Sequence, residues 1–349
     1  MIIILVKNNE LIQSKKSWLD TNTHFLSVIN DPWYKVLMEL QHSITIFTTD
    51  FFNKNGLKNI HLPVTTGSIS SPMGLGSDSI PVKVNIGGVE TYLADSMQFL
   101  LEYGCRLNNE GCYYIMPSFR GEEADERHLC QFFHSEAEIP GTLEDVMLIV
   151  EEYITYLAQN ILESNGDDII KVTGDIEHIK GLAEYGKRLP RMSLDDAVSF
   201  LDKYNTNKDL FITNPEGFRT LTSKGEKVLI EKFGGFLWVT HFDHLSVPFY
   251  QAFDNDKSKA LCADLLFGIG EVIGCGQRHK NKEEISQALD YHNVSPYEYE
   301  WYTMMKEEFP LLTSGFGMGV ERFILWLLKH DDIRDCQIVP RFNGVSINP

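Results

Sequence analysis

The most constraining feature of the sequence is a pair of alternating segments separated by a short charged loop. A strand over residues 112–120, CYYIMPSFR, places every second side chain from Tyr114 to Arg120 on one face. A strand over residues 131–139, QFFHSEAEI, does the same from Phe132 to Glu138. If the two strands pair, Arg120 and Phe132 share a face with carboxylates, and a guanidinium beside an aromatic ring suits an anionic ligand that carries a flat ring. A solvated hairpin with scattered charges is the alternative.

A second hairpin is expected in residues 263–279, ADLLFGIGEVIGCGQRH. A turn at Phe267-Gly268 places Asp264 directly opposite Glu271, with Cβ atoms about 5 Å apart. Two carboxylates at that separation repel unless a proton or a cation lies between them, and Mg²⁺ prefers such oxygen ligands. Arg278 follows seven residues after Glu271 and can point into the same cleft. The alternative is an ordinary acidic hairpin.

A glycine-rich strand and a helix follow in residues 314–330, SGFGMGVERFILWLLKH. Glycines at alternate positions 315, 317 and 319 let the backbone approach a ligand or a neighbouring strand closely. The apolar spacing then predicts a helix over 318–330, with Arg322 in its first turn. A cation at that position opposes the helix dipole unless an anion binds to it. A tight turn from strand to helix is the alternative.

The remaining pattern predicts an α+β fold in which an antiparallel sheet is flanked by helices. Residues 1–32 form an N-terminal appendage and residues 33–349 a single catalytic domain, while residues 165–230 show no clear pattern. Further elements are expected as a helix over 33–55 that ends at Gly56, strands over 82–93 around Gly87-Gly88, a helix over 143–162 and short strands within 236–275. The Gly- and Ser-rich residues 66–80 predict a mobile loop.

Composition limits the partners and the compartment. The 349 residues include 49 acidic and 31 basic ones, so the formal net charge is −18. A chain this acidic is a poor general partner for nucleic acid or an anionic membrane. No apolar run of about 20 residues and no signal-peptide core is present. The six cysteines form no CxxC pair, which indicates reduced thiols and a cytoplasmic location.

Taken in order, these segments resemble the signature motifs of class II aminoacyl-tRNA synthetases, and within them the asparaginyl/aspartyl branch, closest to the asparaginyl enzymes. The first family motif is similar to residues 33–63, the second to FRGEEADERHLCQF (119–132) and the third to GFGMGVERF (315–323). Segments 92–102, 236–250 and 264–278 also look like the family. The resemblance covers residues 35–345. It implies a homodimer formed through the first motif, and a reaction of ATP with an amino acid to give an aminoacyl-adenylate and pyrophosphate.

The resemblance also implies roles for single residues around ATP and Mg²⁺. Arg120 and Arg322 match the catalytic arginines, of which the first bridges the α-phosphate and the attacking carboxylate and the second holds the γ-phosphate. Phe132 matches the ring that stacks on adenine. Asp264 and Glu271 match the acids that bind Mg²⁺, and Glu271 also contacts ATP. The loop that folds over ATP is matched by Glu122, Arg127 and His128.

Around the amino acid, Gln98 matches the residue near the α-amino group, with Ser96 beside it, and Arg278 matches the reader of the side-chain carboxylate or amide. Leu101 departs from the aspartyl enzymes, which have a lysine there, and a pocket with one cation fits an amide better than a carboxylate. Two further departures lie close to the pockets, namely Gln131 in place of glutamate and Cys275-Gly276 in place of Gly-Ser. The amino acid is therefore asparagine, aspartate or a close analogue.

The sequence leaves the acceptor open. Synthetases of this branch carry an N-terminal anticodon-binding domain of about a hundred residues, and the first motif here begins near residue 33. With the charge of −18, this favours an adenylate-forming ligase that passes the aminoacyl group to ammonia, as an asparagine synthetase does, or to another amine. A truncated synthetase that charges tRNA(Asn) is the first alternative, with tRNA not favoured as a partner. A non-catalytic amino-acid sensor is the second.

Overall fold

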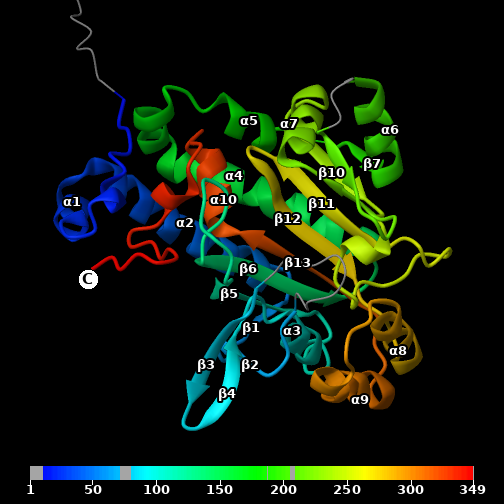
Figure 1. Ribbon diagram of the computed structural model, residues 1–349. Coiled ribbons are helices and arrows are strands. Elements are labelled where there is room, and N and C mark those ends of the chain that lie inside the picture. Colours follow the sequence, from blue (N-terminus) through cyan, green and yellow to red (C-terminus); the bar gives the residue numbers. More distant parts are fainter. Residues whose placement is uncertain (1–10, 71–79, 187, 205–208, 349) are drawn as a thin grey trace, which may run out of the picture.

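The computed structural model describes residues 11–70, 80–186, 188–204 and 209–348. Within these residues a mixed sheet of eight strands forms the centre of the molecule (Figure 1). The strands lie in the order β1 (Lys58–Asn59), β5 (Cys112–Phe119), β6 (Gln131–Pro140), β13 (Thr313–Gly319), β12 (Gly270–Gln277), β11 (Cys262–Phe267), β10 (Phe236–Thr240) and β7 (Arg191–Ser193). All neighbouring pairs are antiparallel except β1 with β5 and β7 with β10 at the two edges. The α+β class and the helix-flanked sheet are confirmed.

The hairpin of β5 and β6 has the register that side-chain alternation predicts. Tyr114 lies opposite Glu136 and Ser118 opposite Phe132. Directly opposed residues of an antiparallel pair project to the same face. Phe132 and Glu138 therefore lie on the same face of the hairpin. Arg120, the residue after β5, extends this face because it follows Ser118 by two positions.

The hairpin of β11 and β12 corrects the predicted register. Phe267 pairs with Gly270, so the turn lies at Gly268-Ile269 rather than at Phe267-Gly268. A β-bulge between Leu265 and Leu266 then shifts the pairing further, and Asp264 lies opposite Gly274 instead of Glu271. Gly268 has a φ of +61°, which glycine adopts without strain and which lets the turn form there. A turn one residue earlier would begin at Phe267, whose side chain disfavours a positive φ, so the expected opposition of Asp264 and Glu271 was wrong.

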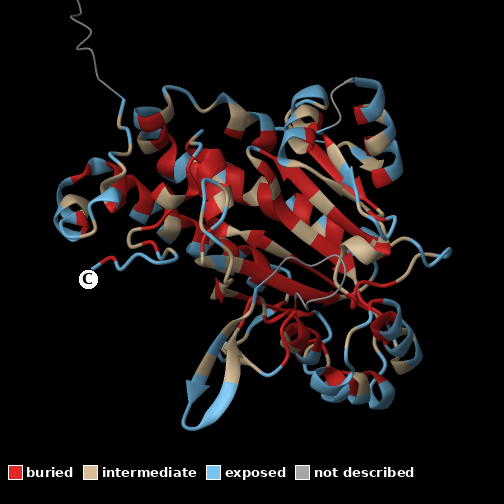
Figure 2. Cartoon of the chain, in the orientation of Figure 1, coloured by how far each residue is buried: buried red, intermediate tan, exposed pale blue. Residues whose placement is uncertain are grey.

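Two long helices cover one face of the sheet. Helix α4 (Leu143–Thr173) packs across β11, β12 and β13 and against α2 (Pro32–Lys54) (Figure 1). Helix α2 begins at Asp31, whose side chain accepts a hydrogen bond from the Trp33 amide at 3.0 Å, with proline at the first helical position. The buried residues gather between these helices and the sheet (Figure 2). The opposite face of the central strands is left for polar side chains.

The predicted helices are confirmed with shifted ends. Helix α2 stops two residues before Gly56, which has a φ of +81°. Helix α4 runs eleven residues past the predicted end at 162, because Ser164-Asn165-Gly166 does not interrupt a face that stays buried at Asn165 and Ile169. The last helix, α10, spans Val320–Leu327 and holds Arg322 in its first turn, as expected.

The segment without a clear pattern folds into short elements beside the sheet, and the others complete the molecule. Residues 165–230 include α5 (Glu177–Ala183), β7, α6 (Leu194–Tyr204), the pair β8 (Phe211–Thr213) and β9 (Arg219–Leu221), and α7 (Ser223–Lys232). The remaining elements are η1 (Ser17–Leu19), α1 (His24–Asn30), β2 (Thr65–Thr66), β3 (Val82–Ile86), β4 (Val89–Leu93), α3 (Gln98–Gly104), η2 (His244–Ser246), α8 (Lys282–Tyr291), η3 (Tyr297–Tyr299), α9 (Glu300–Glu308) and η4 (Ile333–Cys336). Strands β3 and β4 form the predicted hairpin and project from the body (Figure 1).

Three further expectations concern the loop at 66–80, the N-terminal appendage and membrane-spanning helices. Residues 71–79 of the predicted mobile loop lie outside the described residues. The described part of the N-terminal appendage packs on the C-terminal segment, where the indole of Trp18 donates to Asp335 at 2.8 Å and the Ser14 hydroxyl donates to the same carboxylate at 2.6 Å. Among the described residues, none of the helices combines the length and apolar composition that crossing a bilayer requires.

Candidate active site

Two adjoining cavities lie on the sheet face opposite α4. The first has a volume of about 280 Å³ and is bounded by the β5–β6 loop, β12 and the start of α10. The second has a similar volume, about 280 Å³, and lies between α3, β6, β11, β12 and the segment after η2. Both are lined by Arg120, His134, Glu271 and Gly317. These four residues therefore mark the junction at which ligands in the two cavities meet.

Gly317 of β13 lines both cavities, and Gly319 lines the first. A Cβ atom on Gly315 would lie 1.8 Å from an oxygen of Glu138, and one on Gly317 would lie 3.2 Å from an oxygen of Glu136. Gly315 pairs with Glu138 and Gly317 with Glu136 in the sheet. Because Gly315 and Gly317 have no side chains, the carboxylates of Glu138 and Glu136 on β6 have room to lie across β13. The predicted close approach to a neighbouring strand is confirmed.

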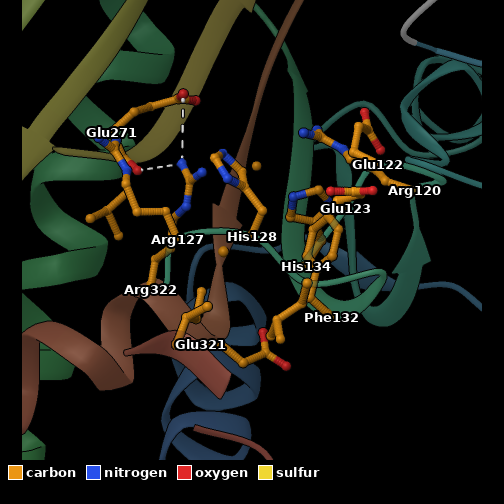
Figure 3. A pocket seen from close by; sticks show the side chains of 15 residues that line it. Arg120, Glu122, Glu123, Arg127, His128, Phe132, His134, Glu271, Glu321 and Arg322 are labelled. Atoms are coloured by element: carbon orange, nitrogen blue, oxygen red, sulfur yellow. Dashed lines mark hydrogen bonds and ion pairs between the residues drawn. The ribbon is translucent and has the colours of Figure 1, made fainter. Parts of the chain in front are cut away.

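In the first cavity, an arginine and an aromatic ring lie together as the alternation predicts. The guanidinium carbon of Arg120 lies 5.5 Å from the centre of the Phe132 ring (Figure 3). On the facing wall, Arg322 donates to the Glu271 carbonyl at 2.6 Å and lies 3.8 Å from its carboxylate. Burial lowers the pKa of Arg322, and the Glu271 charge opposes that shift. An anion bound in the cavity would raise the pKa of Arg322 further, as the Glu271 charge does.

The loop between β5 and β6 supplies charged groups with free hydrogen-bonding positions. Arg127 forms a 2.7 Å ion pair with Glu226 of α7, while its Nε and Nη1 atoms are buried without a partner. Glu122 accepts from the Ile80 amide at 3.1 Å through one oxygen, and its other oxygen is buried and unpaired. His128 lies 2.9 Å from Asp125 and lines the same cavity. The loop is thus held in place while donors remain available.

Unpaired buried polar atoms concentrate at the two cavities. Of the nine such side-chain atoms in the described residues, six belong to Gln98, Arg120, Glu122 and Arg127. Leaving a buried polar group unpaired costs about 1–3 kcal/mol each. Such a cluster at one place is a feature of sites whose partners arrive with a ligand.

Asp264 and Glu271 converge although they are not paired across the hairpin. Oxygens of Glu271 and Asp264 lie 3.0 Å and 3.5 Å from the position of a Cβ on Gly274. Burial, then the charges of Glu271 and Glu226, hold the pKa of Asp264 well above its usual range. The described residues contain no group of three or more metal-ligating side chains, so these two carboxylates would leave most ligand positions to water or phosphate oxygens. That donor set fits Mg²⁺.

The second cavity contains a buried arginine–glutamate pair. Arg278 directly follows β12 and donates to the two Glu138 oxygens at 3.1 Å and 3.0 Å. It also donates to the side-chain oxygen of Gln251 at 3.1 Å and lies over the Tyr250 ring at 5.3 Å. Burial raises the pKa of Glu138 to about 7, against the opposing charge of Arg278. The pair presents a donor and an acceptor side by side in a buried site.

The start of α3 forms the other wall of the second cavity. Gln98 opens the helix, is 5% exposed, and has both side-chain polar atoms without a hydrogen-bond partner. Ser96 donates to Glu136 at 2.6 Å. Burial raises the pKa of Glu136, but the charge of His134 and several hydrogen bonds outweigh burial and lower it overall. Leu101 faces the same cavity, where a lysine would have placed a second cation.

The sequence family of class II tRNA synthetases (D, K and N) matches residues 17–343. The chain belongs to this family. It is an ATP-dependent ligase of the asparaginyl type and is 30% identical over 319 residues to the asparagine–tRNA ligase of Pyrococcus furiosus, which covers 90% of this chain and 70% of that relative. The asparagine–tRNA ligase of Lactobacillus johnsonii is 27% identical over 347 residues, with 97% and 76% covered.

Solved structures of synthetases agree with this placement. The Pyrococcus horikoshii asparaginyl-tRNA synthetase complexed with asparaginyl-adenylate has a TM-score of 0.86 and 26% identity, covering 96% of this chain and 74% of that one. The Entamoeba histolytica asparaginyl-tRNA synthetase with the same adenylate has a TM-score of 0.77 at 23% identity, which shows the shared fold.

In this synthetase-family chain, every residue predicted for the site lines one of the two cavities. The first holds the nucleotide-type residues and the second holds Ser96, Gln98 and Arg278, with Asp264 beside Glu271. Sequence reasoning missed three partners, namely Glu138 and Gln251 on Arg278, and Glu226 on Arg127. Glu138 was placed on the correct face by alternation, which was the one available signal. Glu226 lies in the segment whose pattern was unclear.

Proposed function

We propose that this chain activates asparagine with ATP to form asparaginyl-adenylate and pyrophosphate. The observation that carries the proposal is the buried pair of Arg278 and Glu138, with its 3.0 Å ion pair. A carboxamide has one acceptor oxygen and one donor nitrogen, so Arg278 can donate to the former while ionised Glu138 accepts from the latter. An aspartate side chain would place a second carboxylate against Glu138, which is costly in a buried site.

The nucleotide occupies the first cavity in this proposal. Adenine stacks on Phe132, and Arg322 contacts the terminal phosphate, with Glu122, Arg127 and His128 closing around ATP. Arg120, at the junction of the two cavities, contacts both the α-phosphate and the amino-acid carboxylate. An oxygen of that carboxylate attacks the α-phosphorus, the bond to the β-phosphate oxygen breaks, and pyrophosphate leaves. Positioning and charge neutralisation by the arginines account for the catalysis.

Mg²⁺ is held in this proposal by Asp264 and Glu271, whose oxygens converge above Gly274. When bound, the ion neutralises charge on the phosphate oxygens. The raised pKa of Asp264 means that the folded protein holds a proton there more tightly than an ordinary aspartate does. Deprotonated Asp264 would be the charged ligand, so occupancy of this site would require loss of that proton.

The acceptor of the aminoacyl group is proposed to be tRNA(Asn). The support is the similarity to asparagine–tRNA ligases along 90% of the chain. A non-tRNA acceptor, such as ammonia or an amine, is the second candidate, and the net charge of −18 is the observation that favours it. No relative named above is described as using such an acceptor, and the expectation that tRNA is disfavoured has no support from these similarities.

Two assays test the reaction and the acceptor separately. Asparagine-dependent exchange of labelled pyrophosphate into ATP is expected, and no exchange with any amino acid contradicts the proposal. Incubation with ATP, labelled asparagine and tRNA(Asn) is expected to yield labelled tRNA. Exchange without tRNA charging, together with product formation from ammonia or an amine, supports the second candidate instead.

A homodimer through the first motif is also proposed. Helix α2 leaves Met38 and Ile46 exposed, and α1 leaves Phe25, Leu26 and Ile29 exposed, so apolar side chains remain on this side of the molecule. Light scattering coupled to size exclusion is expected to give twice the chain mass. A monomer at micromolar concentration contradicts this part of the proposal.

A further inference from the structure

A second buried ion pair lies directly behind the amino-acid cavity. Lys306 of α9 and Glu102 of α3 are both fully buried and in contact through Nζ and a carboxylate oxygen. The Tyr302 hydroxyl donates to Glu102 at 2.6 Å, and the Lys306 ammonium donates to the backbone carbonyl of His279 at 2.6 Å. Neither charged group lines either cavity, so neither touches a ligand there.

This pair connects the elements that carry the amino-acid pocket. Glu102 lies one helical turn after Gln98 on α3 and next to Leu101. His279 is the residue after Arg278, whose own amide donates to the Thr313 carbonyl at 2.9 Å. The backbone is thus fixed at Arg278 by β13 and one residue later by Lys306. A shift of Lys306 would therefore reach the guanidinium through the main chain.

Charge gives Lys306 a second effect on the pocket. The Glu102 carboxylate is close enough to raise the pKa of both Arg278 and Glu138. Lys306 compensates that carboxylate, while burial lowers the pKa of the Lys306 ammonium and Glu102 opposes this shift. A buried pair adds little to stability compared with apolar side chains, but removing one partner leaves an uncompensated charge. Without Lys306, the cationic neighbours of Glu102 are Arg278, whose pKa its carboxylate raises, and Arg106, whose guanidinium donates to the Glu102 carbonyl at 2.6 Å.

We propose that Lys306 is a positioning residue for the amino-acid pocket. By pairing with Glu102 and holding the His279 carbonyl, it keeps Arg278 on Glu138 and on the substrate side chain. The identity of that side chain as a carboxamide rests on the proposed function. The role of Lys306 in holding Arg278 does not depend on which amino acid is activated.

The test compares K306M, K306M/E102Q and K16M in pyrophosphate exchange with asparagine, aspartate and ATP varied in turn. K306M is expected to raise the KM for asparagine by about 10- to 100-fold and to lower the preference over aspartate, because small displacements of a binding group have large effects. The KM for ATP is expected to stay within about twofold, since the Lys306–Glu102 pair supports Arg278, which does not line the nucleotide cavity. K306M/E102Q removes the uncompensated charge but lacks the hydrogen bond to His279, so its KM is expected to rise only about threefold to tenfold.

Lys16 provides the matched control, because K16M also breaks an ion pair to a buried acid, Asp332, at 2.9 Å. Its segment lies beside α1, on the opposite side of the molecule from α9 (Figure 1). A lower melting temperature in K306M with unchanged KM for asparagine and unchanged preference, as expected of K16M, overturns the proposal. If K306M does not fold, an unchanged KM in K306M/E102Q overturns it. If the wild-type protein activates a different amino acid, the proposed function is wrong, and the same variants measured with that amino acid still decide on Lys306.

Discussion

The two cavities solve opposite electrostatic problems. The first cavity, proposed above for the nucleotide, holds arginines whose donors are left unpaired, at Nε of Arg120 and at Nε and Nη1 of Arg127. The amino-acid pocket holds Arg278 in two directions, on Glu138 and on Gln251, and is supported from behind by Lys306 and Glu102. Under the proposed function, the first cavity receives a ligand that brings several negative charges. The second receives a neutral side chain that must be told apart from a charged isostere.

This difference between the cavities indicates that the first provides ligand affinity and the second provides selectivity. Unpaired donors gain most from a polyanion such as a triphosphate, which suits binding and catalysis but discriminates weakly among nucleotides. A pre-formed pair of donor and acceptor gains little from any single contact. It instead makes a mismatched ligand costly, because one buried group is then left unpaired or faces a like charge.

The largest expected effect lies at the junction of the cavities. Arg120→Ala is expected to lower kcat/KM for pyrophosphate exchange by about 1,000-fold, because it removes the charge that acts on both reacting groups. The Arg120→Lys variant keeps a charge without the planar fork and should recover only part of the loss. Steady-state exchange kinetics measure both variants. If kcat/KM in Arg120→Ala falls by less than about tenfold, Arg120 does not take part in the reaction.

The next effect concerns selectivity alone. Glu138→Gln is expected to reduce the preference for asparagine over aspartate by about 100-fold, because a neutral amide no longer repels the aspartate carboxylate. Arg278→Ala is also expected to abolish discrimination, but it leaves Glu138 uncompensated and destabilises the fold. Ratios of kcat/KM for the two amino acids, measured together, give the result. An unchanged ratio in Glu138→Gln would place selectivity elsewhere.

Arg322→Ala should act on the nucleotide cavity only. Loss of a charge-assisted contact to phosphate is expected to raise the KM for ATP by about 10- to 100-fold. The KM for asparagine is expected to stay within about twofold. The two KM values are measured by varying ATP or asparagine while the other substrate is saturating. An equal increase in both would contradict a role for Arg322 in the nucleotide cavity alone.

The smallest effect is a pH dependence confined to the amino-acid pocket. Glu138 has a pKa of about 7 in the folded protein, above the ordinary value, so its ionised fraction falls as the pH drops through 7. Between pH 8 and pH 6 the preference for asparagine over aspartate is therefore expected to fall about threefold to tenfold. In Glu138→Gln the preference should not change over this interval. A pH-independent preference in the wild-type protein would argue against ionised Glu138 as the discriminating group.

Much of the site follows from local sequence pattern. Alternation alone placed Arg120 beside Phe132 and put Glu136 and Glu138 on the same face, because a strand has a fixed period of two. The alternate glycines of β13 predicted a close approach to a neighbouring strand, which is β6. Helix α10 and the place of Arg322 followed from the apolar spacing. In each case the information lies within about ten residues.

What the sequence did not predict depends on distant residues or on a single bulge. The partners Arg278 and Glu138 lie 140 positions apart, and no local pattern specifies that their side chains meet. The opposition of Asp264 and Glu271 was expected from a turn one residue too early and without the bulge at Leu265 and Leu266. The carboxylates still converge, because the sheet face, rather than the exact register, sets their direction. The Lys306–Glu102 pair joins two helices that pack only in the folded chain.

Under the proposed function, the pocket around Arg278 and Glu138 selects a carboxamide side chain. The most direct test of this selectivity is pyrophosphate exchange at pH 7.5 with asparagine and aspartate offered separately at equal concentrations. Exchange is expected with asparagine, and the kcat/KM for aspartate is expected to be at least about 100-fold lower, in line with the cost of opposing a buried carboxylate. Equal or greater exchange with aspartate would contradict this selectivity.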